Sequence, residues 1–253
     1  MTALPHAGRR GRQPSAVLVG SVLVLVGTVV AWWAAAQVLF VIPQPTDTVR
    51  ALAEHLVDPA FRTDMRVTAL AVLMAFGIGT LVGALAGLAL GLSTWVRATF
   101  EPLVIGLNGI PKIVLYPVLL PVFHLGYGSK VVMGVLFALF PVLINVAVGV
   151  REVPRVYRKL ARSLDASWWQ YLVHILVPAI RLPLLTGVRL SVSLATVGVV
   201  LSEFFATKQG LGRSILRSYG AGDYPDMMST ILLLVSVSFV VSLLLWRLER
   251  RAR

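Results

Sequence analysis

Three charged side chains fall in or next to long apolar runs of the sequence: Lys112, Arg189 and Glu203. On insertion scales, a lysine at the centre of a membrane-spanning helix is unfavourable by about 2.5–3.5 kcal/mol, so we expect Lys112 to face a cavity and not lipid. There its ammonium would offer an anion a weak, reversible contact. Alternatively, Lys112 caps a carbonyl freed by Pro111 or Pro117, or pairs with an acidic side chain.

The other two charges have equally open roles. Glu203, at the outer end of an apolar run, either lines the outer mouth of a translocation path or is simply exposed to water. Arg189 either extends its guanidinium group to the membrane surface or forms an ion pair, and we expect a structural role. Lys112 and Glu203 are therefore the candidate path residues.

Several kinds of chemistry have no support in the sequence. It contains no Gly-x-x-x-x-Gly-Lys-Ser/Thr loop, so the usual ATP phosphate cradle is missing. There is no Cys, and the 4 His form no His-x-x-x-His pair. Acidic residues are few and dispersed. We expect no catalytic residue, no metal site and no cofactor bound by this chain.

The composition predicts an all-α membrane protein that crosses the bilayer several times. Of 253 residues, 57% are hydrophobic and 13% charged, which is far too apolar for a soluble domain of this length. The net charge of +12 comes from basic residues scattered at helix ends without aromatic residues between them. It predicts membrane topology and not nucleic-acid binding.

Apolar runs of about 20 residues predict six membrane-spanning helices. A basic, disordered tail at 1–15 precedes them, and a tail at 247–253 follows. The first run exceeds the usual 7–15 apolar residues of a signal peptide, the alternative for this segment. A surface helix is predicted at 46–56. The expected spans are 16–42, 67–92, 100–123, 130–150, 182–201 and 227–246.

Two spans have special patterns. In the second, Ala75, Gly79, Gly83, Gly87 and Gly91 recur every fourth residue, which allows close helix packing either within one subunit or across a homodimer seam. The third contains several prolines, so we expect a broken helix surrounded by protein or a water-filled path.

Basic residues favour an orientation with both termini in the cytoplasm. Of 23 Lys and Arg, fourteen fall on the N-terminal side of the predicted membrane and seven on the other, with Lys112 and Arg189 in the spans. Because Lys and Arg collect in cytoplasmic loops, the basic loop after the fourth span should be cytoplasmic.

That loop, residues 154–178, predicts a helical elbow on the membrane surface. One short helix runs from about 154 to 164, and a second begins at Ser167, which with Gln170 fits a capping box. Trp168, Tyr171, Leu172 and Ile175 should form its buried face. The proline at 178 should end the second helix.

The elbow resembles the loop that defines permease subunits of binding-protein-dependent ABC importers. Ala161, Ile175 and Pro178 match its pattern, Val177 replaces the usual Leu, Lys159 the usual Glu and Asp165 the usual Gly. Asp is among the few other residues that tolerate the turn. The resemblance implies docking to an ATPase through Lys159, Ala161, Ser163, Leu164, Asp165, Ile175, Val177 and Pro178. Ala161 would be small because the partner comes close. The alternative is a loop lying on lipid headgroups.

Further segments resemble the nitrate/sulfonate/taurine branch of these permeases. They include Pro43-x-Pro45, Gly109–Pro117, Thr186–Leu190, Glu203 and Gly210–Gly212. The resemblance implies the type I importer transmembrane fold over about 64–246. It also implies a prokaryotic inner-membrane complex of two permeases, expected to form a homodimer, two ATPases that bind the ATP, and an extracytoplasmic solute-binding protein. Its solute would be small and anionic. A stand-alone channel or secondary transporter, or a membrane-embedded enzyme, are the alternatives.

Overall fold

A computed structural model describes residues 14–123 and 126–251, and every regular element in these ranges is a helix. Most of the predicted tail 1–15 and the end of the tail 247–253 lie outside the described residues. The elements are α1 (Pro14–Val38), α2 (Pro45–Val57), α3 (Pro59–Leu92), α4 (Thr94–Gly109), a 3₁₀ turn (Lys112–Leu115), α5 (Tyr116–Phe123), α6 (Tyr127–Glu152), α7 (Arg155–Ser163), α8 (Trp168–Gln170), a π-helical turn (Tyr171–Leu176), α9 (Val177–Ala179), α10 (Arg181–Ala206), α11 (Leu211–Ala221) and α12 (Tyr224–Arg251).

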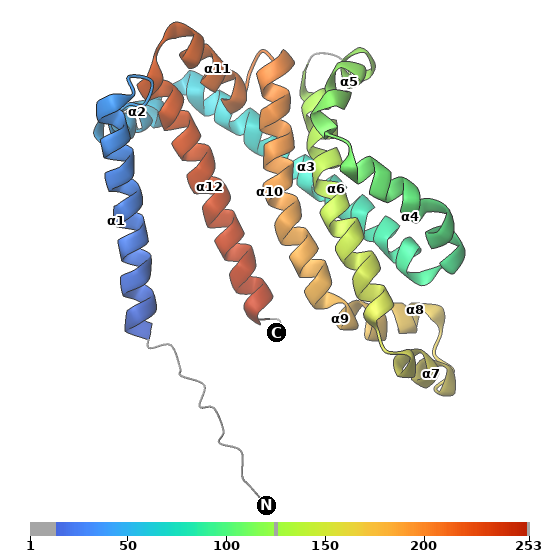
Figure 1. Ribbon diagram of the computed structural model, residues 1–253. Coiled ribbons are helices and arrows are strands. Elements are labelled where there is room, and N and C mark those ends of the chain that lie inside the picture. The colour runs from blue at the N-terminus through green and yellow to red at the C-terminus, as the bar shows by residue number, and fades with distance from the viewer. Residues whose placement is uncertain (1–13, 124–125, 252–253) are drawn as a thin grey trace, which may run out of the picture.

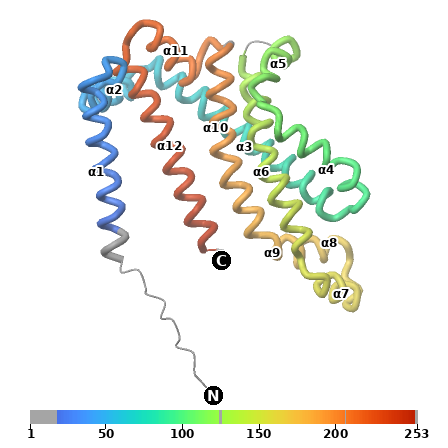
Figure 2. The backbone as a smooth tube through the Cα atoms, in the orientation of Figure 1, coloured from blue at the N-terminus to red at the C-terminus, as the bar shows by residue number. Residues whose placement is uncertain are grey.

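Six membrane-crossing segments are confirmed if the bent third one counts as a single span. Within the described residues, 5 helices are long and apolar enough to cross a membrane, and α4 with the segment 112–123 adds a sixth, bent by 93°. The start of α1 and the end of α12 lie on the same side of the bundle as α7 and α8 (Figures 1 and 2). The helices α2, α5 and α11 lie at the opposite end (Figure 1).

Local sequence explains where the helices begin and end. Pro45 and Pro59 stand in the first turns of α2 and α3, where a missing N–H costs nothing. The Asp58 side chain accepts hydrogen bonds from the amides of Ala60 and Phe61 and so caps α3. At the bend, Ile110 is extended (φ −72°, ψ 133°), as a residue before proline prefers. The predicted break of the third span is thereby confirmed.

The largest difference from the sequence prediction is α11, a helix that the apolar runs do not indicate. The segment 208–217 contains three basic residues and is expected in an outer loop. Residues 211–221 instead form an amphipathic helix whose buried face includes Leu211, Gly212, Ser214, Ile215 and Ser218. The helices α3, α6, α10 and α12 also extend beyond the predicted limits, because polar residues continue them past the apolar runs.

The small-residue ladder of α3 packs within the subunit. A β-carbon added at Gly79 would lie 2.6 Å from Ala138 Cβ, and one at Gly83 would lie 2.6 Å from the Leu139 carbonyl oxygen, both on α6. Helix α6 contacts α3 on one side and α10 on the other (Figure 1). The core of the bundle therefore forms around α6, and the homodimer-seam interpretation of the ladder is wrong.

This packing predicts that Gly87→Ala destabilises the protein. The added carbon would lie 2.6 Å from the Leu143 carbonyl oxygen and 2.8 Å from Val146 Cβ, so the helices must separate. Overpacking of this kind costs about 1–3 kcal/mol, which a thermal unfolding midpoint in detergent will detect. Gly77→Ala is the matched control, because nothing lies within 4 Å of its added carbon. Equal midpoints for the two variants would contradict the packing.

Candidate functional site

The elbow begins with α7, which ends in a hydrogen-bonded turn. The Ala166 amide donates to the Ala161 carbonyl (3.0 Å) and the Asp165 amide to that of Arg162 (3.2 Å). These two bonds form the Schellman motif, in which the residue directly after the C-cap adopts the left-handed conformation. Asp165 has φ +48° and is the one non-glycine residue with positive φ in the described chain. The Asp in place of the family's Gly therefore adopts the expected turn.

The second half of the elbow begins at the predicted capping box. The Ser167 hydroxyl accepts from the Gln170 amide (3.3 Å), and the Gln170 side chain accepts from the Ser167 amide (2.8 Å). The prediction that Pro178 ends this helix is wrong. Helical backbone continues through α9, because residues 171–176 widen into a π-helical turn just before the proline. In this turn the Val177 amide donates to the Leu172 carbonyl, five residues before it, as in a π-helix.

The elbow is anchored by a core that it shares with α6. Ala161, Tyr171, Leu176 and Ile180 are buried and cluster with residues of α6, among them Val150. Leu172 and Ile175 are partly buried and pack against the same cluster. Ala161 is thus surrounded by its own chain, and the expectation that a partner approaches it stays a prediction.

The exposed surface of the elbow carries many large apolar side chains. Trp168, predicted to be buried, is 60% exposed, so that assignment is wrong, and its ring contacts Tyr171 from outside. Lys159, Ser163, Asp165 and Pro178 are exposed as well. We call the exposed large apolar residues of this face the elbow patch: Val156, Tyr157, Leu160, Leu164, Trp168, Trp169, Val173 and Val177.

Lys112 lies at the bend of the third span. Its Nζ donates to the Asn108 carbonyl oxygen and to Asn108 Oδ1, both at 3.3 Å, and lies 4.8 Å from the centre of the Phe140 ring. The Asn108 carbonyl is one that the break before Pro111 leaves without its helical partner. This geometry favours the capping role for Lys112. It is compatible with a role in the translocation path, which stays a prediction.

Glu203 lies in a polar network inside the protein at the end of the bundle opposite the elbow. Its carboxylate pairs with Lys130 Nζ (3.0 Å) and accepts from the Thr68 hydroxyl (2.9 Å) and the Gly212 amide (2.8 Å). The whole residue is 0% exposed and Lys130 only 2%. Within the chain this carboxylate is therefore neither wet nor at an open mouth, and its path role stays a prediction.

The same network holds the loop between α10 and α11. The Gly210 amide donates to Asp64 Oδ1 (2.7 Å), the Leu211 amide donates to the Thr68 hydroxyl (2.8 Å), and Lys130 Nζ donates to the Gln209 carbonyl. Gly210 has φ +123°, and a side chain there would collide with the Glu203 carboxylate. Sequence reasoning missed this network, although a Lys and a Glu at the outer ends of two apolar runs were its signal.

Arg189 is paired, which confirms its expected structural role. Its Nη1 lies 3.0 Å from Glu249 Oε2, and the Thr186 hydroxyl donates to Glu249 Oε1 (3.2 Å). Glu249 itself is buried, although the sequence places it in the C-terminal tail. The pair ties the end of α12 to α10.

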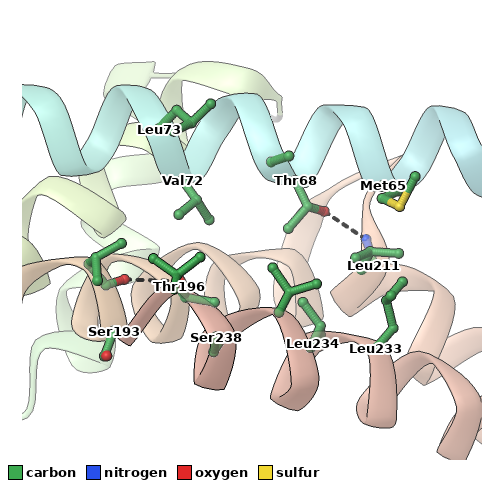
Figure 3. A pocket seen from close by; sticks show the side chains of 14 residues that line it. Met65, Thr68, Val72, Leu73, Ser193, Thr196, Leu211, Leu233, Leu234 and Ser238 are labelled. Carbon is green, nitrogen blue, oxygen red and sulfur yellow. Dashed lines mark hydrogen bonds between the residues drawn. The ribbon is translucent and has the colours of Figure 1, made fainter. Parts of the chain in front are cut away.

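An apolar cavity of about 260 Å³ opens between α3, α10 and α12 (Figure 3). Side chains of Met65, Val72, Leu233 and Leu234 dominate its lining, and Thr68 bonds with the Leu211 amide at its edge (Figure 3). Its lining contains no charged residue and offers a polar solute little to bind.

Comparison with known proteins identifies the family of this chain. A model of the family described as "Binding-protein-dependent transport system inner membrane component" matches residues 79–253. The chain belongs to this family. The matched range includes the elbow and five of the six membrane-crossing segments in whole or in part.

Several curated permeases are similar over most of this permease. A probable ABC transporter permease of Haemophilus influenzae is 27% identical over 90% of this chain and 95% of its own length. The taurine permease TauC of Escherichia coli is 25% identical over 87% and 83%, respectively. The nitrate import permease NrtB of Synechococcus elongatus is 29% identical over 67% of this chain and 61% of its own.

The fold also matches a solved transporter. The permease superposes on a chain of the MetNI methionine ABC transporter in an inward-facing conformation, with a TM-score of 0.65 and 19% identity over 74% of this chain and 93% of that one. The likeness confirms the predicted transmembrane-domain fold of ABC importers.

The buried network predicts a large effect of Lys130→Met. Removing the ammonium leaves the Glu203 carboxylate charged and unpaired inside the protein, which costs about 3–5 kcal/mol for pairs of this kind. The double variant Lys130→Met with Glu203→Gln should lose clearly less, because no charge is left unpaired. Thermal unfolding in detergent measures these two variants and Glu203→Gln alone, with Lys208→Met, at an exposed loop position, as the control. The pairing would be contradicted if the double variant lost as much stability as the two single variants lose together.

Proposed function

We propose that the chain is the permease subunit of an ATP-driven importer for a small anionic solute. The sequence has no ATP-binding loop of its own, so the energy must come from a partner ATPase. Relatives named for nitrate, aliphatic sulfonates and taurine support a small solute with an oxyanion group. Lys112, at the bend of the third span, is the cation that such a solute would meet there.

The elbow patch is the observation that carries this proposal. The elbow lies outside the predicted spans, and eight large apolar side chains exposed on so short a segment mark an interaction surface. The patch stands on two short helices that a Schellman turn, a capping box and a shared core hold rigidly. Because the elbow is rigid and joined to α6, its patch is suited to docking to an ATPase. Closure of the ATPases would then move the spans as rigid bodies.

The complete complex would contain two copies of this permease, two ATPases and an extracytoplasmic solute-binding protein. The transmembrane domain would cover about 64–246, with α1 outside that core. The elbow and both termini would face the cytoplasm of a prokaryote, and α2 and α11 would face the binding protein. ATP would bind only to the ATPase subunits.

Leu164→Glu tests the docking role. Leu164 is 68% exposed in the elbow patch, so the substitution leaves the permease folded while placing an unpaired carboxylate in the interface. Burying such a charge costs several kcal/mol, and recovery of the ATPase with the tagged permease should fall about tenfold or more. Asp165→Gly is the control and should retain the ATPase, because glycine prefers the same left-handed turn. Undiminished ATPase recovery with Leu164→Glu would rule out docking through the patch.

The orientation is tested by labelling single cysteines, because the sequence contains no Cys. Ser163→Cys lies in the elbow and Lys208→Cys in the loop between α10 and α11, and both positions are exposed. A membrane-impermeant maleimide should label Lys208→Cys in intact cells and Ser163→Cys only after permeabilisation. The reverse pattern would invert the proposed topology.

A further inference from the structure

We propose that a cavity between α4 and α6 is a binding station for a small oxyanion with a short apolar part. The inference rests on the proposed function, since it assigns residues to the anionic solute. The cavity has a volume of about 240 Å³ and is lined by Arg97, Glu101 and Asn108 of α4 and by Arg151 of α6. Its lining residues on α6, from Leu143 to Arg151, lie in the half of that helix that leads into the elbow.

Three polar residues of α4 lie on one face of the helix, with Val104 and Ile105 between them. Arg97, Glu101 and Asn108 are separated by four and seven residues, so they lie above one another on one side of the helix. Beyond the bend, Lys112 continues this stripe, because its ammonium lies 3.3 Å from Asn108 Oδ1. The stripe thus runs from the bend of the third span to the elbow end of the bundle.

The charges of the cavity favour an anion. Two guanidinium groups face one carboxylate: Arg151 Nη1 lies 2.8 Å from Glu101 Oε1, a single contact that leaves most of its donors available. For Arg97 the described residues provide neither an ion pair nor a side-chain hydrogen bond. Guanidinium groups bind planar and tetrahedral oxyanions through paired hydrogen bonds. An incoming oxyanion would bind Arg97 and compete with Glu101 for Arg151.

The floor of the cavity limits the size and nature of the ligand. Leu90, Leu143 and Ala147 are buried there and form one apolar cluster. At ~30 Å³ per water molecule, the volume corresponds to about eight waters, which suits a short alkyl sulfonate or carboxylate better than a large solute. The apolar floor would receive the alkyl part and the arginines the charged head.

The position of Arg151 connects the station to the elbow. Its neighbour Val150 belongs to the core that anchors Ala161 and Tyr171 of the elbow. The Glu101–Arg151 pair fastens α4 to the end of α6 that carries this core. A bound oxyanion that displaces Glu101 would break the ion pair between α4 and α6. This pair lies near the junction of α6 with the elbow.

The test uses the permease with its co-purified ATPase in phosphatidylcholine nanodiscs. Thermal stabilisation by ethanesulfonate, at constant ionic strength, gives the Kd, and ethanesulfonamide serves as the uncharged analogue of the same size. Ethanesulfonate should stabilise the wild type and ethanesulfonamide should not. Arg97→Gln should raise the Kd about 10- to 100-fold, the usual range for a lost hydrogen bond to a charged group.

Three further variants sharpen the test. Arg97→Lys should recover part of the affinity, and Glu101→Gln should lower the Kd because it removes the competing carboxylate. Arg247→Gln, an exposed charge at the same end of α12, should change nothing. An Arg97→Gln variant that binds ethanesulfonate as tightly as the wild type, or equal stabilisation by ethanesulfonamide, overturns the station.

Two measurements distinguish a solute station from a lipid site and from failure of the proposed function. Nanodiscs containing phosphatidylglycerol test for a lipid headgroup: Arg97-dependent stabilisation by that lipid without any effect of ethanesulfonate overturns the solute station. ATPase recovery is scored on the same samples. A wild-type permease that never recovers an ATPase overturns the proposed function whatever the Kd, whereas recovered ATPase with an unchanged Kd in Arg97→Gln overturns only the station.

Discussion

The ion pair between Lys130 and Glu203 is the constraint on which the half of the bundle opposite the elbow depends. Two opposite charges inside a protein of low dielectric must be close and fully hydrogen-bonded, since desolvating each one costs several kcal/mol. Here Thr68, the Gly212 amide and the Gln209 carbonyl complete the pair. Satisfying these groups determines where α3, α6, α10 and the start of α11 meet.

Helix α6 connects that network to the elbow. Lys130 lies in its first turn, and Val150 in its last turns joins the elbow core. At 1.5 Å per residue, the helix is about 39 Å long and links the two ends as one rigid element. Small residues of α3 let it pack backbone to backbone, and a displacement of the elbow would therefore move α6 and its neighbours together.

Much of the local structure was predictable because it depends on neighbouring residues. The capping box at Ser167, the left-handed turn at Asp165 and the break before Pro111 follow from backbone preferences that act within a few positions. Predictions that depended on what lies opposite a side chain were less reliable. Trp168 is exposed, and a π-helical turn carries the elbow past Pro178.

The membrane character, the apolar runs, the elbow and the family resemblance could be predicted without the structure. Apolar length, turn residues and motif spacing are linear properties of the chain. Only the tertiary structure assigned the glycine ladder to α6, paired Lys130 with Glu203, formed α11 and brought Arg151 to the polar stripe of α4. The physical reason is that these interactions join residues far apart in the chain, and burial and electrostatic pairing depend on which surfaces meet when the helices pack.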